Sequence, residues 1–169
     1  KFGASSIYFD GTGDYLDVAS SSDFQFGTGD FTLEAWVYLT AIGAYQNIFD
    51  TYSPSGSNGF LAEIWSDNTI SFYSEGGVGW RTPGGTVMAI NTWYHLAWVR
   101  DGNNLRMFVN GVQAGATQTL SSSDNYTGGA LRIGGRSTAQ WFNGYMDEVR
   151  ISKGIARWTA AFTPPTRRY

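Results

Sequence analysis

The stretch Ile7–Leu39, IYFDGTGDYLDVASSSDFQFGTGDFTLEAWVYL, decides the fold. It contains two short apolar runs, a serine-rich connection and the long apolar and aromatic segment Phe31–Leu39. The acidic, glycine-rich turn Asp10–Asp14 (DGTGD) separates the two short runs. Because glycine accepts the positive φ that other residues resist, this turn predicts that the two runs pair as an antiparallel hairpin.

The composition favours one all-β domain. At 169 residues the chain is long enough to bury its own core. Aromatic residues make up 17% of it, glycine occurs 22 times, and charged residues make up only 15%. Many strands with aromatic cores and glycine turns give this profile, and a helical bundle does not. The polar surface must then be largely Ser, Thr, Asn and Gly, which suits hydroxyl-rich partners.

Charge, cysteine content and the lengths of apolar runs limit the partners, source and location that we expect. A net charge of −3 argues against a nucleic-acid partner, since phosphate binding needs clustered cations. The absence of cysteine favours a bacterial or viral source. No apolar run approaches the length of a membrane span, so we expect no membrane insertion. The start at Lys1, without an initiator Met or a signal peptide, suggests a mature or excised piece.

Candidate strands recur about every ten residues, the spacing of a β-sandwich. The Asn110-Gly111 pair predicts a type I′ hairpin, and Gly154–Ala161 suits at most one helical turn before the prolines. The expected strands are Ser6–Asp10, Tyr15–Ala19, Phe31–Leu39, Gln46–Tyr52, Phe60–Trp65, Thr69–Ser74, Thr86–Ala89, Trp93–Asp101, Asn104–Val109, Val112–Thr117, Ala130–Gly134 and Tyr145–Ser152.

The strand Trp93–Asp101 is apolar or aromatic at both alternating sets of positions. A strand of this kind is covered on both faces, so we expect it in the middle of the sandwich or under a covered surface. His95 is the only histidine and lies within this strand, which favours a structural role over a catalytic one.

A second informative segment, Phe142–Ile151 (FNGYMDEVRI), lies near the other end of the chain. Together with Ile7–Leu39 it resembles the LamG-like (laminin G/pentraxin type) group of the concanavalin A-like lectin/glucanase superfamily. The resemblance covers essentially the whole chain. It implies a jelly-roll sandwich of two antiparallel sheets, closed by pairing of the N- and C-terminal strands, as one domain over residues 1–164 with a tail at 165–169.

The resemblance also implies a structural calcium ion. Asp10 and Asp147 would supply carboxylate oxygens and Gly13 a backbone carbonyl, which are ligands that calcium prefers. The alternative is that Asp10 and Asp14 only cap their turn and are solvated.

Seven Trp and ten Tyr residues offer rings that can stack on sugars. Three of the Trp lie inside strong strands and are assigned to the core, namely Trp36, Trp93 and Trp98. Trp80 and Trp141 instead follow a glycine-rich and a polar stretch, which predicts loops, and binding residues concentrate on loops carried by a rigid scaffold.

We therefore expect glycan contact through Trp80 and Trp141, with Arg81 and Asn143 reaching sugar hydroxyls. The alternative is that these two Trp cover edges of the core. Lesser candidates are Tyr45, Tyr52 and Tyr126.

No acid pair typical of glycan hydrolases is recognisable, because Glu34, Glu63 and Glu75 stand alone in their segments. The favoured function is a non-catalytic module that binds a glycan or polysaccharide. It would belong to a larger extracellular protein, at a cell or virion surface, since both chain ends resemble modules of bacterial and phage surface proteins. The alternative is a structural or adhesion module that binds protein partners or spaces neighbouring domains, because this fold hosts both roles.

Overall fold

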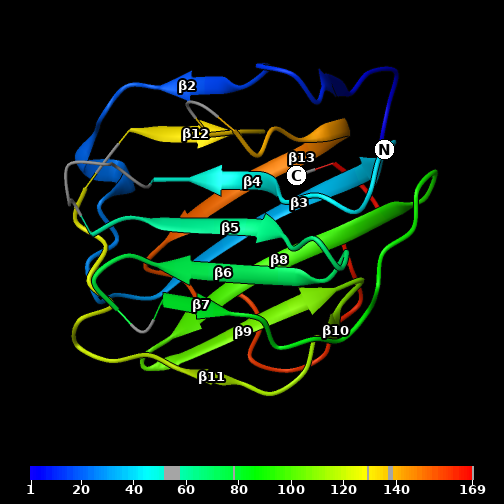
Figure 1. Ribbon diagram of the computed structural model, residues 1–169. Coiled ribbons are helices and arrows are strands. Elements are labelled where there is room, and N and C mark those ends of the chain that lie inside the picture. Colours follow the sequence, from blue (N-terminus) through cyan, green and yellow to red (C-terminus); the bar gives the residue numbers. More distant parts are fainter. Residues whose placement is uncertain (52–57, 78, 129, 137–138, 169) are drawn as a thin grey trace.

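The computed structural model describes residues 1–51, 58–77, 79–128, 130–136 and 139–168, which form two antiparallel sheets packed face to face (Figure 1). The seven-stranded sheet has the order β1 (Ile7–Asp10), β13 (Asn143–Lys153), β3 (Phe31–Leu39), β8 (Trp93–Asp101), β9 (Asn104–Val109) and β10 (Val112–Gln113), with β11 (Gln118–Thr119) also on β9. The six-stranded sheet has the order β2 (Leu16–Val18), β12 (Leu131–Ile133), β4 (Gln46–Asp50), β5 (Phe60–Ile64), β6 (Ile70–Ser74) and β7 (Gly79–Arg81). The expected all-β jelly-roll sandwich is confirmed.

The turn Asp10–Asp14 does not close a hairpin, so that prediction is wrong. β1 pairs with β13 in one sheet, whereas β2 pairs with β12 in the other, and the turn carries the chain between layers. Gly11 and Gly13 do have positive φ angles, of 81° and 87°. The glycines therefore predicted correctly that the chain turns here, but a glycine turn does not determine which sheet the next strand joins.

The N- and C-terminal strands pair as expected. β1 lies antiparallel to β13 from Ile7 opposite Met146 to Asp10 opposite Asn143, and β13 continues onto β3 along most of its length. This pairing closes the seven-stranded sheet and brings both ends of the chain to its outer surface.

Of the other local elements expected from the sequence, some are present and others are not. The Asn110-Gly111 hairpin between β9 and β10 is confirmed, with φ angles of 52° and 77° at the two turn residues. The expected strand at Thr86–Ala89 is absent from the described structure, as is a helical turn over Gly154–Ala161. Instead β7 and β11 form, and Ser22–Phe24 makes a short 3-10 turn. No helix in the described ranges is long and apolar enough to cross a membrane.

The core lies between the sheets and is rich in aromatic rings. Phe31, Phe60 and Phe72 stack with ring centroids 5.4 to 6.3 Å apart, and Tyr126 packs edge-on against all three. Trp98 of β8 is fully buried, and its Nε1 donates to the Ser71 carbonyl of the opposite sheet at 2.8 Å. The core assignment of Trp98 is therefore confirmed, and its indole also ties the two layers together.

The outer face of β8 and β9 is covered by the chain that follows β13. Ala97, Val99 and Phe108 form a second apolar cluster, against which Trp158 and Phe162 pack. The rings of Trp158 and Phe162 are stacked, 3.9 Å apart and nearly parallel. The expectation that β8 is covered on both faces is confirmed for its buried residues, His95 to Arg100. We call Gly154–Thr166 the covering segment.

A buried polar network lies beneath the covering segment. His95 is fully buried, and its Nε2 lies 3.1 Å from Glu34 Oε2, while Arg150 Nε donates to Glu34 Oε1 at 2.6 Å. The rings of Trp158 and Phe162 close over His95 edge-on, each at 5.7 Å. These contacts agree with a structural role for His95.

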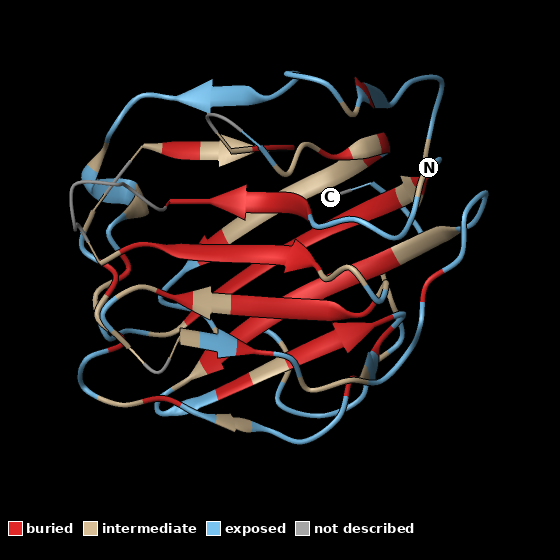
Figure 2. Ribbon diagram, in the orientation of Figure 1, coloured by how far each residue is buried: buried red, intermediate tan, exposed pale blue. Residues whose placement is uncertain are grey.

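The middle of the six-stranded sheet is buried on both faces, as the colouring of β4 and β5 shows (Figure 2). Glu63 lies on the face away from the core, since its neighbours Ala62 and Ile64 belong to the core. It is nonetheless fully buried, with Oε2 and the facing amide of Asn47 lacking hydrogen-bond partners in the described structure. Burial raises the pKa of Glu63 to about 8.

Trp98→Ala should destabilise the fold by about 3–5 kcal/mol, because it removes a large buried ring and an inter-sheet hydrogen bond. Trp80→Ala, at a residue 40% exposed, should cost clearly less. Urea unfolding of both variants at neutral pH measures the difference. Equal losses would contradict the placement of Trp98 in the core and Trp80 at the surface.

Glu63→Gln should change how stability depends on pH. The unfolded carboxyl ionises above about pH 4.5 while the folded one stays protonated to about pH 8, so this residue lowers the stability of the wild type across that window. The variant should gain about 1.4 kcal/mol relative to wild type for each pH unit between these values. Urea unfolding from pH 4.5 to 8.5 tests this, and parallel curves for the two proteins would contradict it.

Candidate functional site

The structure does not gather the four predicted glycan-contact residues into one site. Trp80 lies in β7, an edge strand rather than a loop, and Tyr73 of β6 is its register partner. Trp141 follows Gln140, whose carbonyl accepts a hydrogen bond from Asn47 N of β4 at 2.9 Å. β5 and β6 separate these positions, a distance on the order of 14 Å at the usual strand spacing.

Arg81 faces away from Trp80 and into the molecule, so its predicted ligand role is not supported. It is 4% exposed, and its Nη2 donates to both carboxylate oxygens of Asp124 at 3.0 Å. Burial alone raises the pKa of Asp124, but hydrogen bonds from Ser121 and Ser74 and the charge of Arg81 outweigh it and lower that pKa. This buried, bidentate pair is structural.

Asn143 and Trp141 are tied into the framework as well. The Asn143 side-chain oxygen accepts a hydrogen bond from the Thr40 hydroxyl, and its backbone N donates to Gln46 Oε1 at 2.8 Å. The Asn143 amide packs closely on Gly11: a Cβ atom added at position 11 would lie only 2.5 Å from Asn143 Nδ2. Trp141 is half-buried, which agrees with the alternative that it covers a core edge.

Trp80 belongs to a compact aromatic cluster at the edge of the six-stranded sheet. Its ring centroid lies 4.6 Å from those of Trp65 and Tyr73, and Tyr45 lies 4.6 Å beyond Trp65. Trp80 and Tyr45 are 40% and 37% exposed, so they remain ligand-contact predictions. Tyr126 is buried, and Tyr52 lies outside the described residues.

The predicted calcium ligands do not form a common shell. Asp10 is opposite Asn143 in the β1–β13 pairing, so Asp147 lies four residues farther along β13, on the order of 13 Å away. Asp10 Oδ1 accepts from Thr12 N at 2.6 Å, and Asp14 Oδ2 accepts from Asp10 N at 3.1 Å, which matches the turn-capping alternative. Within the described ranges no three His, Asp or Glu side chains gather as a metal site.

The Asp147 carboxylate instead anchors the start of the chain. Oδ2 accepts from Phe2 N at 2.7 Å and from the Lys1 α-amino group. Burial alone raises the pKa of Asp147, but these hydrogen bonds and one from Glu148 N hold it below its usual value. This anchoring places Lys1 and Phe2 on the outer face of the seven-stranded sheet.

Sequence reasoning missed an aromatic row on that outer face. Tyr8 of β1, Tyr145 of β13, Tyr38 of β3 and Trp93 of β8 are direct register partners across four neighbouring strands. Successive ring centroids are 5.0, 5.9 and 5.5 Å apart. Each ring points outward, because its neighbours Phe9, Met146, Val37 and Tyr94 pack in or against the core.

The aromatic row is accessible. Tyr8 is 53% exposed and Tyr145 36%, while Tyr38 and Trp93 are half-buried. From the sequence, Trp93 is assigned to the core because it lies in an apolar strand. That assignment is wrong, because Trp93 is the first residue of β8 and its side chain points away from the core. A hollow of about 270 Å³ follows the row, lined by Ser6, Tyr38, Trp93 and Tyr145.

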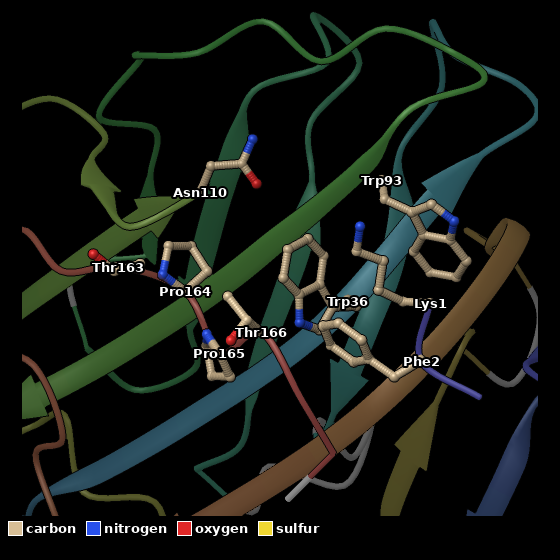
Figure 3. A pocket seen from close by; sticks show the side chains of 9 residues that line it. All are labelled: Lys1, Phe2, Trp36, Trp93, Asn110, Thr163, Pro164, Pro165 and Thr166. Atoms are coloured by element: carbon tan, nitrogen blue, oxygen red, sulfur yellow. The ribbon is translucent and has the colours of Figure 1, made fainter.

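A larger cavity of about 560 Å³ adjoins the row at Trp93 (Figure 3). Trp93 and Phe2 stand on one side, the covering segment stands on the other, and Trp36 and Lys1 lie between them. Its lining residues are Lys1, Phe2, Trp36, Trp93, Asn110, Thr163, Pro164, Pro165 and Thr166. The two hollows share Trp93, so row and cavity form one surface, which we call the outer binding surface.

Residues 10–158 match a family model described as the concanavalin A-like lectin/glucanases superfamily. Comparison with curated proteins gave no match.

Several solved structures are similar. The carbohydrate-binding module CBM40 of Ruminococcus gnavus IT-sialidase, bound to α2,3 sialyllactose, is 13% identical with a TM-score of 0.69, over 89% of this chain and 90% of that one. Domain 4 of a Geobacillus stearothermophilus extracellular arabinanase, in complex with arabinotriose, is 20% identical with a TM-score of 0.65, over 90% and 77%. Domains LG4-5 of the mouse laminin α1 chain are 16% identical with a TM-score of 0.66, over 87% and 40%.

At these identities the solved structures establish the fold. The family model spans most of the chain, from the acidic turn to the covering segment. The chain therefore belongs to the Laminin_G_3 family of the concanavalin A-like lectin/glucanases superfamily.

Proposed function

We propose that this protein is a non-catalytic glycan-binding module and that a glycan chain lies along the aromatic row Tyr8–Tyr145–Tyr38–Trp93. The observation that carries the proposal is the register, which places four outward rings side by side on neighbouring strands. Strands lie about 4.8 Å apart, a spacing comparable with the length of one sugar residue in a chain. Aromatic faces and edges pack well on the C–H surfaces of sugar rings.

Polar groups beside the row suit a hydroxyl-rich ligand. Ser6 lines the hollow along the rings, and Asn91 Oδ1 accepts a hydrogen bond from the Tyr38 hydroxyl at 3.4 Å. Sugar complexes of two similar structures, with sialyllactose and with arabinotriose, support a glycan as the ligand class. An extracellular setting, within a larger protein, is part of the proposal.

The geometry gives less support to hydrolysis. Asp50 and Glu63 lie on the same face of neighbouring strands, but they are 3% and 0% exposed. Asp50 Oδ2 lies 4.0 Å from Arg136 Nε, and Glu63 Oε1 accepts a hydrogen bond from the Ser71 hydroxyl at 3.4 Å. A retaining pair must reach the glycosidic bond from both sides, and this buried pair is covered.

Tyr8→Ala and Tyr145→Ala should each weaken glycan binding by about 1–2 kcal/mol, roughly tenfold, since each removes an exposed stacking ring. Both variants should fold normally. A glycan array screened with wild type identifies the ligand, and titration calorimetry then measures each variant against it.

Tyr15→Ala is the matched control, because Tyr15 is 39% exposed but lies outside the row. Trp80→Ala tests the competing cluster on the six-stranded sheet. Loss of affinity in Trp80→Ala, with Tyr8→Ala and Tyr145→Ala unchanged, would move the site to that sheet. No binding to any arrayed glycan would contradict the function itself.

Structural calcium stays a prediction, now restricted to the acidic turn. If Asp10, Asp14 and the Gly13 carbonyl hold the ion, a chelator should lower the melting temperature by several degrees. The reason is that calcium at a free concentration of about a hundred times its Kd stabilises the folded state by about 2.7 kcal/mol. Asp10→Ala should abolish the effect, whereas Asp147→Asn should preserve it. An unchanged melting curve, with no metal in the purified protein, would leave the turn-capping alternative.

A further inference from the structure

We infer that the cavity at the Trp93 end of the outer binding surface takes an anionic sugar residue, one bearing a carboxylate or a sulfate ester. The inference rests on the proposed function, because it names the ligand chemistry at one end of the same surface. The polar side chains that line the cavity include three with hydrogen-bond donors, Lys1, Trp36 and Asn110.

Lys1 supplies a cation without a counter-ion. Its Nζ lies 4.9 Å from the ring centroid of Trp36 and 5.7 Å from that of Phe2. In the part of the chain that the structure describes, no carboxylate pairs with Nζ, since Asp147 accepts only from the backbone nitrogens of this segment. An ammonium held by aromatic faces alone remains available to an anion.

Trp36 supplies a buried donor without an acceptor. Its side chain lines the cavity and is 8% exposed, and Nε1 has no hydrogen-bond partner among the described residues. Leaving a buried N–H unpaired costs about 1–3 kcal/mol, so a ligand that brings an acceptor recovers that free energy on binding.

Asn110 adds a third donor. Its Oδ1 accepts a hydrogen bond from His95 N at 2.9 Å, which fixes the amide and leaves Nδ2 to donate. The cavity lining contains no Asp or Glu. Three donors, one of them charged, without a facing carboxylate favour an acceptor-rich anion over a neutral or cationic ligand.

The walls fit a sugar ring. Phe2, Trp93, Pro164 and Pro165 are apolar surfaces around the donors. A volume of about 560 Å³ lies within the range of small-molecule sites. Because Trp93 also ends the aromatic row, a glycan lying along the row presents its next residue to Lys1 and Trp36.

The test uses an array of uronic-acid oligosaccharides, each displayed both as the free acid and as its neutral methyl ester, together with sulfated oligosaccharides. Wild type should bind the anionic member of a pair about tenfold more tightly, and 0.5 M NaCl should reduce that preference. Comparison of the carboxylate and sulfate members identifies which anion the cavity takes.

Two conservative variants assign the preference to the cavity. Lys1→Gln should remove most of it, and Trp36→Phe, which keeps a ring but loses the N–H, should reduce it. Tyr8→Ala should instead weaken acid and ester binding equally, because it acts on the row.

The outcomes separate the two proposals. Binding that depends on Tyr8 but treats acid and ester alike would overturn the anionic site and leave the glycan module standing. An anionic preference that survives in both Lys1→Gln and Trp36→Phe would also overturn it. Absence of binding to every arrayed sugar would overturn both.

Discussion

The long β13 strand, hydrogen-bonded to β1 on one side and to β3 on the other, is the constraint on which the rest of the molecule depends. It fixes the two ends of the chain on one surface and sets Tyr145 between Tyr8 and Tyr38. A slip of one residue in either pairing would turn the rings toward the core and the apolar residues outward. The register that closes the fold therefore also builds the proposed binding surface.

The two sheets differ in how much of their outer faces is accessible. The six-stranded sheet buries its central strands on both faces and holds the carboxyl of Glu63, whose pKa is raised by burial, while Trp80 stays exposed at its edge. The seven-stranded sheet leaves the row and the cavity open at one end, and the covering segment buries Ala97, Val99 and Phe108 on the outer face of β8 and β9. The proposed binding surface and the most deeply buried strands thus lie in different parts of the same sandwich.

Much of the fold was predictable because its signals are local. Phe31–Leu39 and Trp93–Asp101 were bounded correctly from their apolar content, and Asn110-Gly111 from its turn chemistry. The proposed site was not predictable from the sequence, because the aromatic row exists only through pairing between distant strands. The assignment of Trp80 and Arg81 to one loop also failed, since successive residues of a strand point to opposite faces.

The covering segment has a further consequence for where this domain can be cut. A fragment ending at Lys153 would retain every strand, yet it would uncover Val99 and Phe108 and expose the buried pair of His95 and Glu34 to water. It would also lose Pro164, Pro165 and Thr166, which form one wall of the cavity. The smallest unit that keeps both the covered outer face and the cavity wall therefore reaches at least to Thr166, thirteen residues past the end of β13.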